Sequence, residues 1–447
     1  RTFPLLSISP TTSHTMTEFP DIEIEHASRE TLIAHQSTRL TSLIRGLPGR
    51  NQFYTQKLAD ANVNAKQLTF PNELSVLPFT TKSELVADQT AAPPWGTALS
   101  EPLSHYVRYN QTSSTTGNPL RWIDTAESWQ WMLDCWKAVY RAARVSNEDR
   151  IFFPFSFGPF LGFWTGFDAA TQIGAHTIPS GGMTSHSRLT LIDTVQPTVV
   201  CCTPTYALRL LDVAQERGLS LSSSSVGTII VAGEPGGSIP ATRKRIEDGW
   251  GARVIDHYGL TEVGPIGFEC WHSPGSVHIN EQEFIAEVLD PETSQPVADG
   301  QQGELVITNL GRVGSPVIRY RTRDLVVRTL TPCTCGRIFA RLVGGVTARA
   351  DDMVNVRGVN VYPSAIEAVI RTIPEVLEYR CTVTGEPSNR SVAIEIEPMA
   401  TSNTDFVVEH VTNQIRQALG LSVVVHSVGP GVLPRFEMKA HRFLVDQ

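Results

Sequence analysis

The sequence predicts an α/β fold: a large N-terminal domain with doubly wound, mostly parallel sheets and a small β-subdomain, followed by a small C-terminal α+β domain. Three observations support this prediction. The chain has 447 residues, which is too long for one compact core. From about Arg150, short apolar runs alternate with helical periods. After Asn280, and again after Asp351, the pattern of strands and helices changes, which indicates further structural units.

The middle of the chain has the pattern of a parallel sheet. The runs RIFFPFSF, GAHTIP, TVVCCTP, VGTIIVAG and RVIDHYG, between residues 150 and 259, lack the polar alternation of half-exposed strands. Helical periods such as TYALRLLDVAQERG separate them, as crossover helices separate parallel strands. Ligands of such sheets bind beyond the carboxyl ends of the strands, so we expect the chemistry directly after each run.

The rest of the chain shows three different sequence patterns. Polar turns interrupt FIAEVLDPETSQPVADGQQGELVITNL and PVIRYRTRDLVVRTL, which predicts the small β-subdomain. From Asp351, strands such as SVAIEIEP mix with helices such as DFVVEHVTNQIRQALG, which predicts a compact α+β domain. Residues 1–15 are rich in Ser and Thr and carry a single Arg. We expect them to be a disordered leader ahead of Met16, the natural start, rather than a transit peptide.

Composition excludes several classes of protein. Hydrophobic residues make up 41% and charged residues 18%, a globular balance that excludes disorder of the chain as a whole. The net charge of −8 provides no global positive field, so we expect no nucleic-acid partner. The most apolar stretch, Ile151 to Phe167, contains Pro154 and Pro159 and is too short to span a membrane. Seven cysteines in so long a chain indicate a reducing compartment, the cytoplasm, rather than a disulfide scaffold.

A hydroxyl-rich segment follows the predicted strand HYVRYNQ. It reads TSSTTGNP, from Thr112 to Pro119. Hydroxyl and backbone N–H groups of this kind can surround phosphate oxygens. A Ser/Thr-rich surface turn is the alternative interpretation, and the segment lacks the lysine of the nucleotide loop G-x-x-x-x-G-K-[ST].

Two further segments follow predicted strands. In DHYGLTEVG, residues 256–264, Thr261 could donate to a phosphate and Glu262 could hold Mg²⁺. In YRTRD, residues 320–324, Asp324 could accept both hydroxyl groups of a ribose. A strand-to-helix turn with a capping Thr and an ordinary turn Asp are the alternatives.

These three segments, in this order and at these separations, resemble the AMP-forming adenylating superfamily of acyl-CoA synthetases, and most closely its phenylacetate-CoA ligase branch. The resemblance covers the chain from about Leu77, in LPFTTKSEL, to Arg442. It rests also on GEP at residues 233–235 and on LPRFEMKAHR near the C-terminus. The elements CTCGR and DDMVNVRGVNVYPSAIE favour this branch over its relatives.

The resemblance implies a two-step reaction that uses one site twice. A carboxylate attacks the α-phosphate of ATP to give an acyl-adenylate and pyrophosphate, and the thiolate of coenzyme A then displaces AMP. Lys439, which would otherwise be a solvated surface charge, would neutralise charge in the first step, Thr261 would contact the α-phosphate and Glu262 would hold Mg²⁺. The other residues that it implies in nucleotide binding are Ser113, Ser114, Thr115, Thr116 and Gly117 for the β- and γ-phosphates, and Gly233, Glu234, Pro235, His257, Tyr258, Gly259, Asp324 and Arg349 for the rest of the nucleotide.

The same resemblance implies two domains that move. Residues 16–348 would form the large domain, residues 349–351 the hinge with Asp351 as its pivot, and residues 352–447 the small mobile domain. Rotation between the half-reactions would remove Lys439 and bring Gly358 to line the tunnel of the thiol, where a glycine permits close approach.

Four residues depart from the family pattern. Ser114, Ala348 and Met438 stand where the family has Gly, and Asn118 stands where it often has Lys. Each change stiffens a loop or removes a charge, which we expect to slow turnover rather than abolish it. A degenerate enzyme of low activity is the alternative.

Four thiol and imidazole groups have a spacing that fits a metal. Cys270 and His278, together with Cys333 and Cys335 of a C-x-C element, could form a closed tetrahedral Zn²⁺ site. Buried apolar thiols are the alternative, and His272 is a competing ligand. The resembling branch has the same elements, which favours zinc. With four protein ligands the metal would be structural.

The Phe-rich segment is the candidate site for the acid. Phe157, Gly158, Phe160 and Trp164 could wall a flat apolar pocket, with a buried aromatic core as the alternative. We therefore predict an AMP-forming CoA ligase for an aromatic or arylacetic acid, with ATP, Mg²⁺, coenzyme A and structural Zn²⁺, and, as among its relatives, a homodimer. Transfer of the acyl group to a carrier protein or an amine, and a non-catalytic nucleotide binder on the same scaffold, are the alternative functions.

Overall fold

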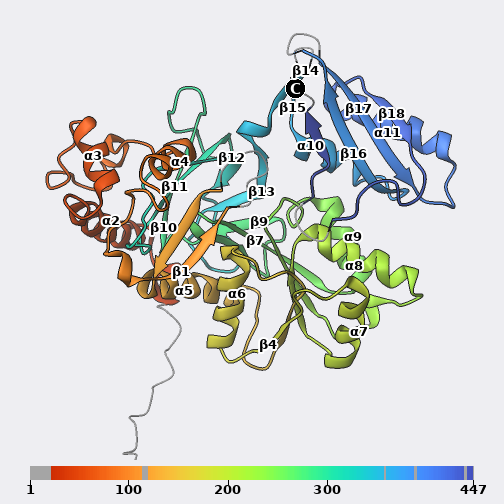
Figure 1. Ribbon diagram of the computed structural model, residues 1–447, viewed down its shortest axis with the longest axis horizontal. Coiled ribbons are helices and arrows are strands. Elements are labelled where there is room, and N and C mark those ends of the chain that lie inside the picture. The colour runs from red at the N-terminus through yellow and green to blue at the C-terminus, as the bar shows by residue number, and fades with distance from the viewer. Residues whose placement is uncertain (1–21, 113–118, 357–358, 387–389, 437–439, 446–447) are drawn as a thin grey trace, which may run out of the picture.

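The computed structural model describes residues 22–112, 119–356, 359–386, 390–436 and 440–445. Figure 1 shows a large domain and, at the upper right, a smaller C-terminal domain in blue. The predicted leader, residues 1–15, and the predicted start at Met16 lie outside the described residues. Every helix in the described ranges is too short or not apolar enough to cross a membrane.

One mixed sheet forms the centre of the large domain. Its eleven strands have the order β10-β11-β12-β13-β9-β8-β7-β6-β5-β3-β4. In chain order the strands are β3 (Arg150–Phe153), β4 (His176–Pro179), β5 (Val199–Cys202), β6 (Thr228–Ala232), β7 (Arg253–Leu260), β8 (Gly264–Glu269), β9 (Ser276–Ile279), β10 (Phe284–Leu289), β11 (Gln302–Asn309), β12 (Tyr320–Thr329) and β13 (Arg341–Arg349).

Strands β3 to β7 are parallel and covered by helices on both faces. Their order, β4-β3-β5-β6-β7, is a doubly wound order. Ile151 and Phe153 pack into the cluster that contains α5 and α6, whereas Phe152 packs into the cluster that contains α7, α8 and α9. Burial on both faces explains why these runs lack polar alternation. The helices are α5 (Ala126–Ala142), α6 (Leu161–Gln172), α7 (Ser185–Val195), α8 (Pro204–Glu216) and α9 (Pro240–Trp250), with a short 3-10 turn η3 (Leu221–Ser223).

The predicted α/β class is confirmed, with one difference in the sheet. The strands predicted as a separate small β-subdomain instead continue the parallel strands in one sheet. From β7 outward, strands β8, β9, β13, β12, β11 and β10 pair antiparallel, so the sheet as a whole is mixed rather than mostly parallel. The reason is the turn at residues 261–263, which returns the chain beside β7 as a hairpin instead of leading into a crossover helix.

Helices and a hairpin precede the sheet in the chain. Helix α4 begins with a capping box in which Thr81 and Glu84 satisfy each other's backbone amides. Thr80 pairs with Tyr320 of β12, so the start of α4 lies beside the YRTRD segment. The elements are α1 (Ile22–Glu25), α2 (Arg29–Gly46), α3 (Gln52–Asp60), η1 (Leu74–Val76), α4 (Lys82–Ala91), η2 (Leu103–His105), β1 (Tyr106–Gln111) and β2 (Arg121–Thr125).

The C-terminal domain has its own core, as the sequence predicts. After η4 (Ala350–Asp352), a hairpin precedes a four-stranded sheet of order β18-β17-β16-β19, and both helices pack on a cluster of buried aliphatic side chains. Helix α11 is capped by Asn403 at its start and by Gly420, with φ of 64°, at its end. The elements are β14 (Val354–Val356), β15 (Val359–Val361), α10 (Pro363–Ile370), β16 (Val376–Thr384), β17 (Ser391–Pro398), α11 (Thr404–Leu419), β18 (Val424–Ser427) and β19 (Phe443–Val445).

Candidate functional site

The segments GEP and HYGLTE meet at one edge of the sheet. Strands β6 and β7 are parallel, with Ala232 opposite His257, and GEP follows β6 directly. Strand β7 continues beyond this pair, and residues 261–263 form the turn to β8. This hairpin turn excludes the alternative of a strand-to-helix turn with a capping Thr. Thr261 and Glu262 therefore lie at the carboxyl end of β7, where ligands of such sheets bind.

Asp324 is the buried centre of a hydrogen-bonded group. Its carboxylate accepts from the hydroxyl of Tyr258 at 2.5 Å and from Nη1 of Arg349 at 3.2 Å. Arg349 also donates to both carboxylate oxygens of Asp351, at 3.0 and 2.9 Å. Burial raises the pKa of Asp324 to about 6, against the opposing effect of the Arg349 charge. The structure thus joins the predicted ribose carboxylate to the predicted hinge residue through one arginine.

Glu262 is buried and has a cationic neighbour that the sequence analysis missed. Nζ of Lys82 lies 3.4 Å from Oε1 of Glu262. Burial and the adjacent Glu262 carboxylate raise the pKa of the Tyr320 hydroxyl. Lys82 belongs to LPFTTKSEL, the segment where the resemblance begins. The sequence analysis predicted no function for any residue of this segment. An ammonium group attracts phosphate oxygens, and a carboxylate is a suitable ligand for the Mg²⁺ that accompanies nucleotide phosphates.

The carboxylate of Glu234 is held by two backbone amides. Oε1 accepts from the amide of Thr205, on α8, at 2.8 Å, and Oε2 accepts from the amide of Ala440, in the small domain, at 3.0 Å. Burial raises the pKa of this carboxyl. Ala440, which belongs to the segment LPRFEMKAHR, therefore contacts the edge of the sheet where GEP lies. The predicted residues that lie outside the described part of the chain are Ser113, Ser114, Thr115, Thr116, Gly117, Gly358 and Lys439, together with the departures Asn118 and Met438.

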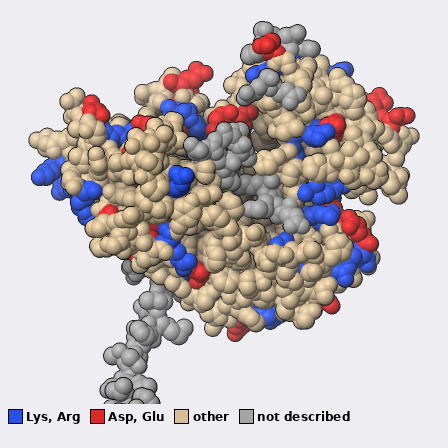
Figure 2. Space-filling model, in the orientation of Figure 1, with Lys and Arg blue, Asp and Glu red and all other residues tan. Residues whose placement is uncertain are grey.

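Two ion pairs fix the chain on either side of residues 437–439. Arg442 donates to both oxygens of Glu378, at 2.6 and 3.0 Å, and Arg435 pairs in the same way with Glu397. Bidentate pairs of this kind restrict geometry as well as adding energy. Figure 2 shows Lys and Arg side chains gathered at the right of the view, where the small domain faces α8 and α9.

Cys270, His278, Cys333 and Cys335 converge as predicted. Their ligand atoms all lie within 4.8 Å of one another, and three of the four residues are buried. The two sulfur atoms of Cys270 and Cys333 are 3.7 Å apart, and Sγ of Cys335 lies 3.5 Å from Nε2 of His278. Nδ1 of the same imidazole faces the carbonyl oxygen of Phe339 at 3.2 Å.

Two stretches of the chain match described protein families. Residues 50–311 match the family described as AMP-binding enzyme, and residues 358–447 match the AMP-binding enzyme C-terminal domain. The phenylacetate-coenzyme A ligase of Thermus thermophilus is 32% identical over 446 residues, covering 95% of this chain and 98% of that protein. The ligase of the same name from Escherichia coli is 32% identical, covering 94% of this chain and 96% of its own.

The chain belongs to the AMP-binding enzyme family.

Solved structures share the fold of this AMP-binding enzyme. A crystal structure of 2-hydroxyisobutyryl-CoA ligase in the postadenylation state superposes with a TM-score of 0.91 at 24% identity, covering 97% of this chain and 95% of that one. The same ligase in the thioesterification state, with CoA, gives a TM-score of 0.74 at 26% identity over the same shares of both chains.

Other predicted residues of this AMP-binding enzyme have mainly structural surroundings. Nδ1 of His257 lies 2.7 Å from the carbonyl oxygen of Gly267, its ring lies 4.2 Å from that of Trp136, and burial lowers its pKa to about 4. This imidazole is therefore neutral at pH 7 and belongs to the core. At Gly259 an added Cβ would lie 2.9 Å from the oxygen of Gly264, so only glycine permits the approach of β8. Two residues of GEP, Gly233 and Pro235, are exposed.

The aromatic segment lies directly after β3, at the same end of the parallel strands. Rings of Phe157 and Trp164 are 4.7 Å apart, and Nε1 of Trp164 donates to the carbonyl oxygen of Gly158 at 2.9 Å. Phe157, Phe160 and Trp164 are half-buried, whereas Phe155, nearer the strand, is buried. The segment therefore combines a core part with a partly exposed aromatic surface at the strand ends.

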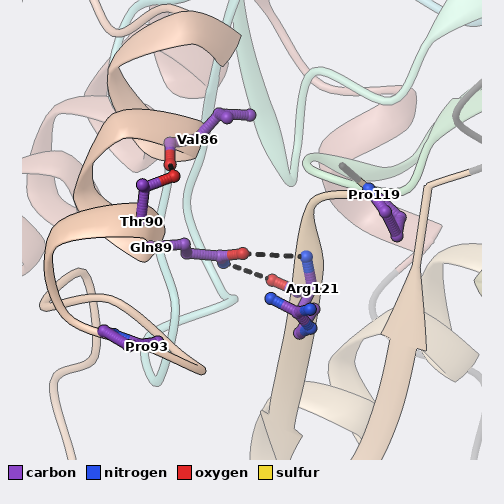
Figure 3. A pocket seen from close by; sticks show the side chains of 6 residues that line it. All are labelled: Val86, Gln89, Thr90, Pro93, Pro119 and Arg121. Atoms are coloured by element: carbon purple, nitrogen blue, oxygen red, sulfur yellow. Dashed lines mark hydrogen bonds between the residues drawn. The ribbon is translucent and has the colours of Figure 1, made fainter. Parts of the chain in front are cut away.

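A cavity of about 230 Å³ lies beside the β1–β2 hairpin, between α4 and β2. Its lining includes Gln89, whose side-chain amide donates to the carbonyl oxygen of Arg121 at 2.6 Å and accepts from its amide at 3.0 Å, as Figure 3 shows. Gln89 thus satisfies the open edge of β2 in place of a neighbouring strand. Among the predicted site residues that the structure describes, none lines this cavity.

Proposed function

We propose that this AMP-binding enzyme is an AMP-forming CoA ligase that activates an aromatic or arylacetic carboxylic acid. The observation that carries the proposal is the hydrogen bond from the amide of Ala440, the residue after Lys439 in the chain, to Glu234, which directly follows the first glycine after β6. The near full-length relatives named phenylacetate-coenzyme A ligase support the reaction class and the class of acid.

In the first step the acid carboxylate attacks the α-phosphorus of ATP. A bond forms between a carboxylate oxygen of the acid and the α-phosphorus. The bond from the α-phosphorus to the oxygen that bridges to the β-phosphate breaks, and pyrophosphate leaves with the electron pair. Because two anions must meet, catalysis consists of positioning and charge neutralisation. Asp324 accepts from the ribose hydroxyls, Thr261 donates to the α-phosphate, and Lys439 and Lys82 supply positive charge. Glu262 would hold Mg²⁺, which neutralises phosphate charge when bound.

In the second step the thiolate of coenzyme A attacks the acyl carbon and AMP leaves. This step uses the same acyl site after the small domain has turned about residues 349–351. The lower TM-score with the thioesterification state than with the postadenylation state of one ligase supports two domain arrangements. The bonds from Arg349 to Asp324 and Asp351 support a hinge that begins directly beside the nucleotide.

The acid would bind at the half-buried aromatic surface after β3. Phe157, Phe160 and Trp164 present flat apolar groups at the strand ends, which suits the ring of an aryl or arylacetic acid. A straight-chain acid would leave part of this surface in contact with water.

The cysteine cluster would hold structural Zn²⁺. A tetrahedral zinc with Zn–S bonds of about 2.3 Å separates two sulfurs by about 3.8 Å and a sulfur from an imidazole nitrogen by about 3.5 Å. The distances of 3.7 Å between Cys270 and Cys333 and of 3.5 Å between Cys335 and His278 match these values. The carbonyl of Phe339 would hold Nδ1–H and direct Nε2 to the metal. With no open position, zinc would tie β8 and β9 to the turn between β12 and β13.

A panel of carboxylic acids tests the function. We expect acid-dependent exchange of pyrophosphate into ATP with aryl or arylacetic acids, and release of AMP with a thioester product when CoA is added. Exchange without thioester formation would assign the acyl group to another acceptor. Absence of exchange with every acid would contradict the proposal.

We propose that the enzyme works in the cytoplasm. All seven cysteines are free, which supports a reducing compartment, the cytoplasm. We also propose a homodimer, because a dimer is common among the enzymes that the chain resembles. Light scattering at micromolar concentration measures the oligomeric state, and a monomer would contradict this proposal.

A further inference from the structure

Two side chains hold the turn that carries Glu262, one from the last residue of β11 and one from the connection that follows it. Nδ2 of Asn309 donates to the carbonyl oxygen of Val263 at 3.1 Å, and Nη1 of Arg312 donates to the carbonyl oxygen of Thr261 at 2.7 Å. These carbonyl groups belong to the residues immediately before and after Glu262. The turn is therefore fixed on both sides of the predicted Mg²⁺ ligand.

Arg312 is itself anchored in the core. Its Nε and Nη2 donate to the two carboxylate oxygens of Asp124, both at 2.6 Å, and both side chains have an exposed fraction of 0%. The guanidinium lies 5.0 Å from the centre of the Trp122 ring. Asp124 and Trp122 belong to β2, the strand that follows the hydroxyl-rich segment. Arg312 thus links this hairpin to the turn of Glu262 through three hydrogen bonds.

Stability alone is a poor explanation for this ion pair. Removing two charges from water costs several kcal/mol per ion, and apolar replacements of a buried pair are often neutral or stabilising. What a guanidinium provides and an apolar pair cannot is a rigid planar set of donors, here directed at Asp124 and at the carbonyl of Thr261. An error of about 1 Å in the position of a reacting or charge-neutralising group can cost about 100-fold in rate.

We propose that Arg312, held by Asp124, is a positioning residue that fixes the turn of Thr261 to Val263 so that the Glu262 carboxylate faces Mg²⁺ and the nucleotide phosphates. Asn309 supports the same turn from its other side. The inference rests on the proposed function, because it concerns how this enzyme would present Glu262 to Mg·ATP.

Two variants separate positioning from stability. Arg312→Lys keeps a charge beside Asp124, but its single ammonium group cannot serve both carboxylate oxygens and the carbonyl of Thr261. The double variant Asp124→Leu with Arg312→Met removes both charges, so no unpaired charge stays buried. The matched control is Arg29→Lys. Arg29, on helix α2, likewise donates to both carboxylate oxygens of one glutamate, Glu281, and to one carbonyl oxygen, that of Ile338.

The readouts are the dependence of pyrophosphate exchange on Mg²⁺, the kcat and KM for each substrate, and the thermal midpoint. We expect both Arg312 variants to need about 10-fold more Mg²⁺ for half-maximal exchange and to lose about 10-fold or more in kcat. The KM for the acid should stay within about twofold of the wild-type value, since Arg312 and Asp124 contact no aromatic residue of the acid site. Arg29→Lys should keep wild-type kinetics.

Wild-type Mg²⁺ dependence and kcat in both Arg312 variants would overturn the inference, as would an equal loss in Arg29→Lys. A wild-type enzyme without exchange activity would contradict the proposed function instead. Calorimetric titration with Mg·ATP then still tests the positioning role of Arg312, because it measures binding and needs no turnover. Weaker binding in both Arg312 variants than in wild type supports the inference, and equal binding refutes it.

Discussion

The backbone amide of Ala440 donates to the carboxylate of Glu234 at 3.0 Å, across the boundary between the two domains. Ala440 directly follows Lys439 in the chain, and Glu234 directly follows the first glycine after β6. This bond therefore connects the small domain, at the residue after the predicted catalytic lysine in the chain, to the segment that follows β6. A rotation of the small domain would break it, so the two half-reactions should respond differently to its loss.

Glu234→Gln should slow the first half-reaction alone. The side-chain amide can accept one of the two backbone N–H groups, but its nitrogen cannot accept the other. A hydrogen bond to a charged group contributes about 1.5–3 kcal/mol, so we expect acid-dependent pyrophosphate exchange to fall about 10-fold or more. Conversion of a supplied acyl-adenylate to the thioester should keep its wild-type rate. Equal loss in the two assays would show that the bond serves the fold instead.

Lys439→Ala should abolish adenylate formation while leaving thioester formation from a supplied adenylate. The reason is that the ammonium group neutralises charge only while the carboxylate approaches the α-phosphate. Stopped assays of each half-reaction measure this. Lys244→Ala, an exposed lysine on α9 that pairs with Asp248, is the control and should leave both rates unchanged. Loss of both half-reactions in Lys439→Ala would refute the domain rotation.

The decline of kcat/KM for ATP at low pH, which is the acid limb of its pH profile, should follow the ionisation of the Asp324 carboxyl. Burial raises the pKa of this carboxyl to about 6, and the ionised form is the better acceptor for ribose hydroxyls. We therefore expect kcat/KM for ATP to fall as the pH drops through about 6. Tyr258→Phe removes a hydrogen bond that favours the ionised carboxylate, so the pKa of Asp324 should rise and the limb should move to higher pH. Because the ionisation of ATP is common to both enzymes, identical limbs would contradict this assignment.

The cysteine cluster should contain about one zinc per chain by elemental analysis. Cys333→Ser removes a thiolate ligand, so we expect loss of the metal and a lower thermal midpoint, because zinc would join three segments of the large domain. Cys381→Ser changes a buried cysteine of the small domain outside the cluster and should retain the zinc. A folded wild-type protein without metal would exclude the zinc site.

Part of the candidate site was predictable, because Thr261 and Glu262 directly follow a strand in a recognisable segment. Thr261, Glu262 and Asp324 were predicted from strand-end position. The structure places Thr261 and Glu262 directly after β7, whereas Asp324 lies inside β12 and is connected to β7 by its hydrogen bond with Tyr258. Lys82 was missed because its segment forms an ordinary capped helix start, and only the pairing of Thr80 with Tyr320 brings it to Glu262. The single sheet of eleven strands was not predicted. A local sequence pattern indicates strands and turns, but it does not indicate which strands pair with each other.

Residue order determined the α/β class, the separate C-terminal core and the kinds of chemical group near each strand end, since these depend on local periodicity and residue type. The tertiary structure decided which groups meet: Arg312 with Asp124, 188 positions apart, and Ala440 with Glu234, 206 positions apart. Such contacts arise from the packing of whole elements, and no local pattern in either segment encodes its distant partner.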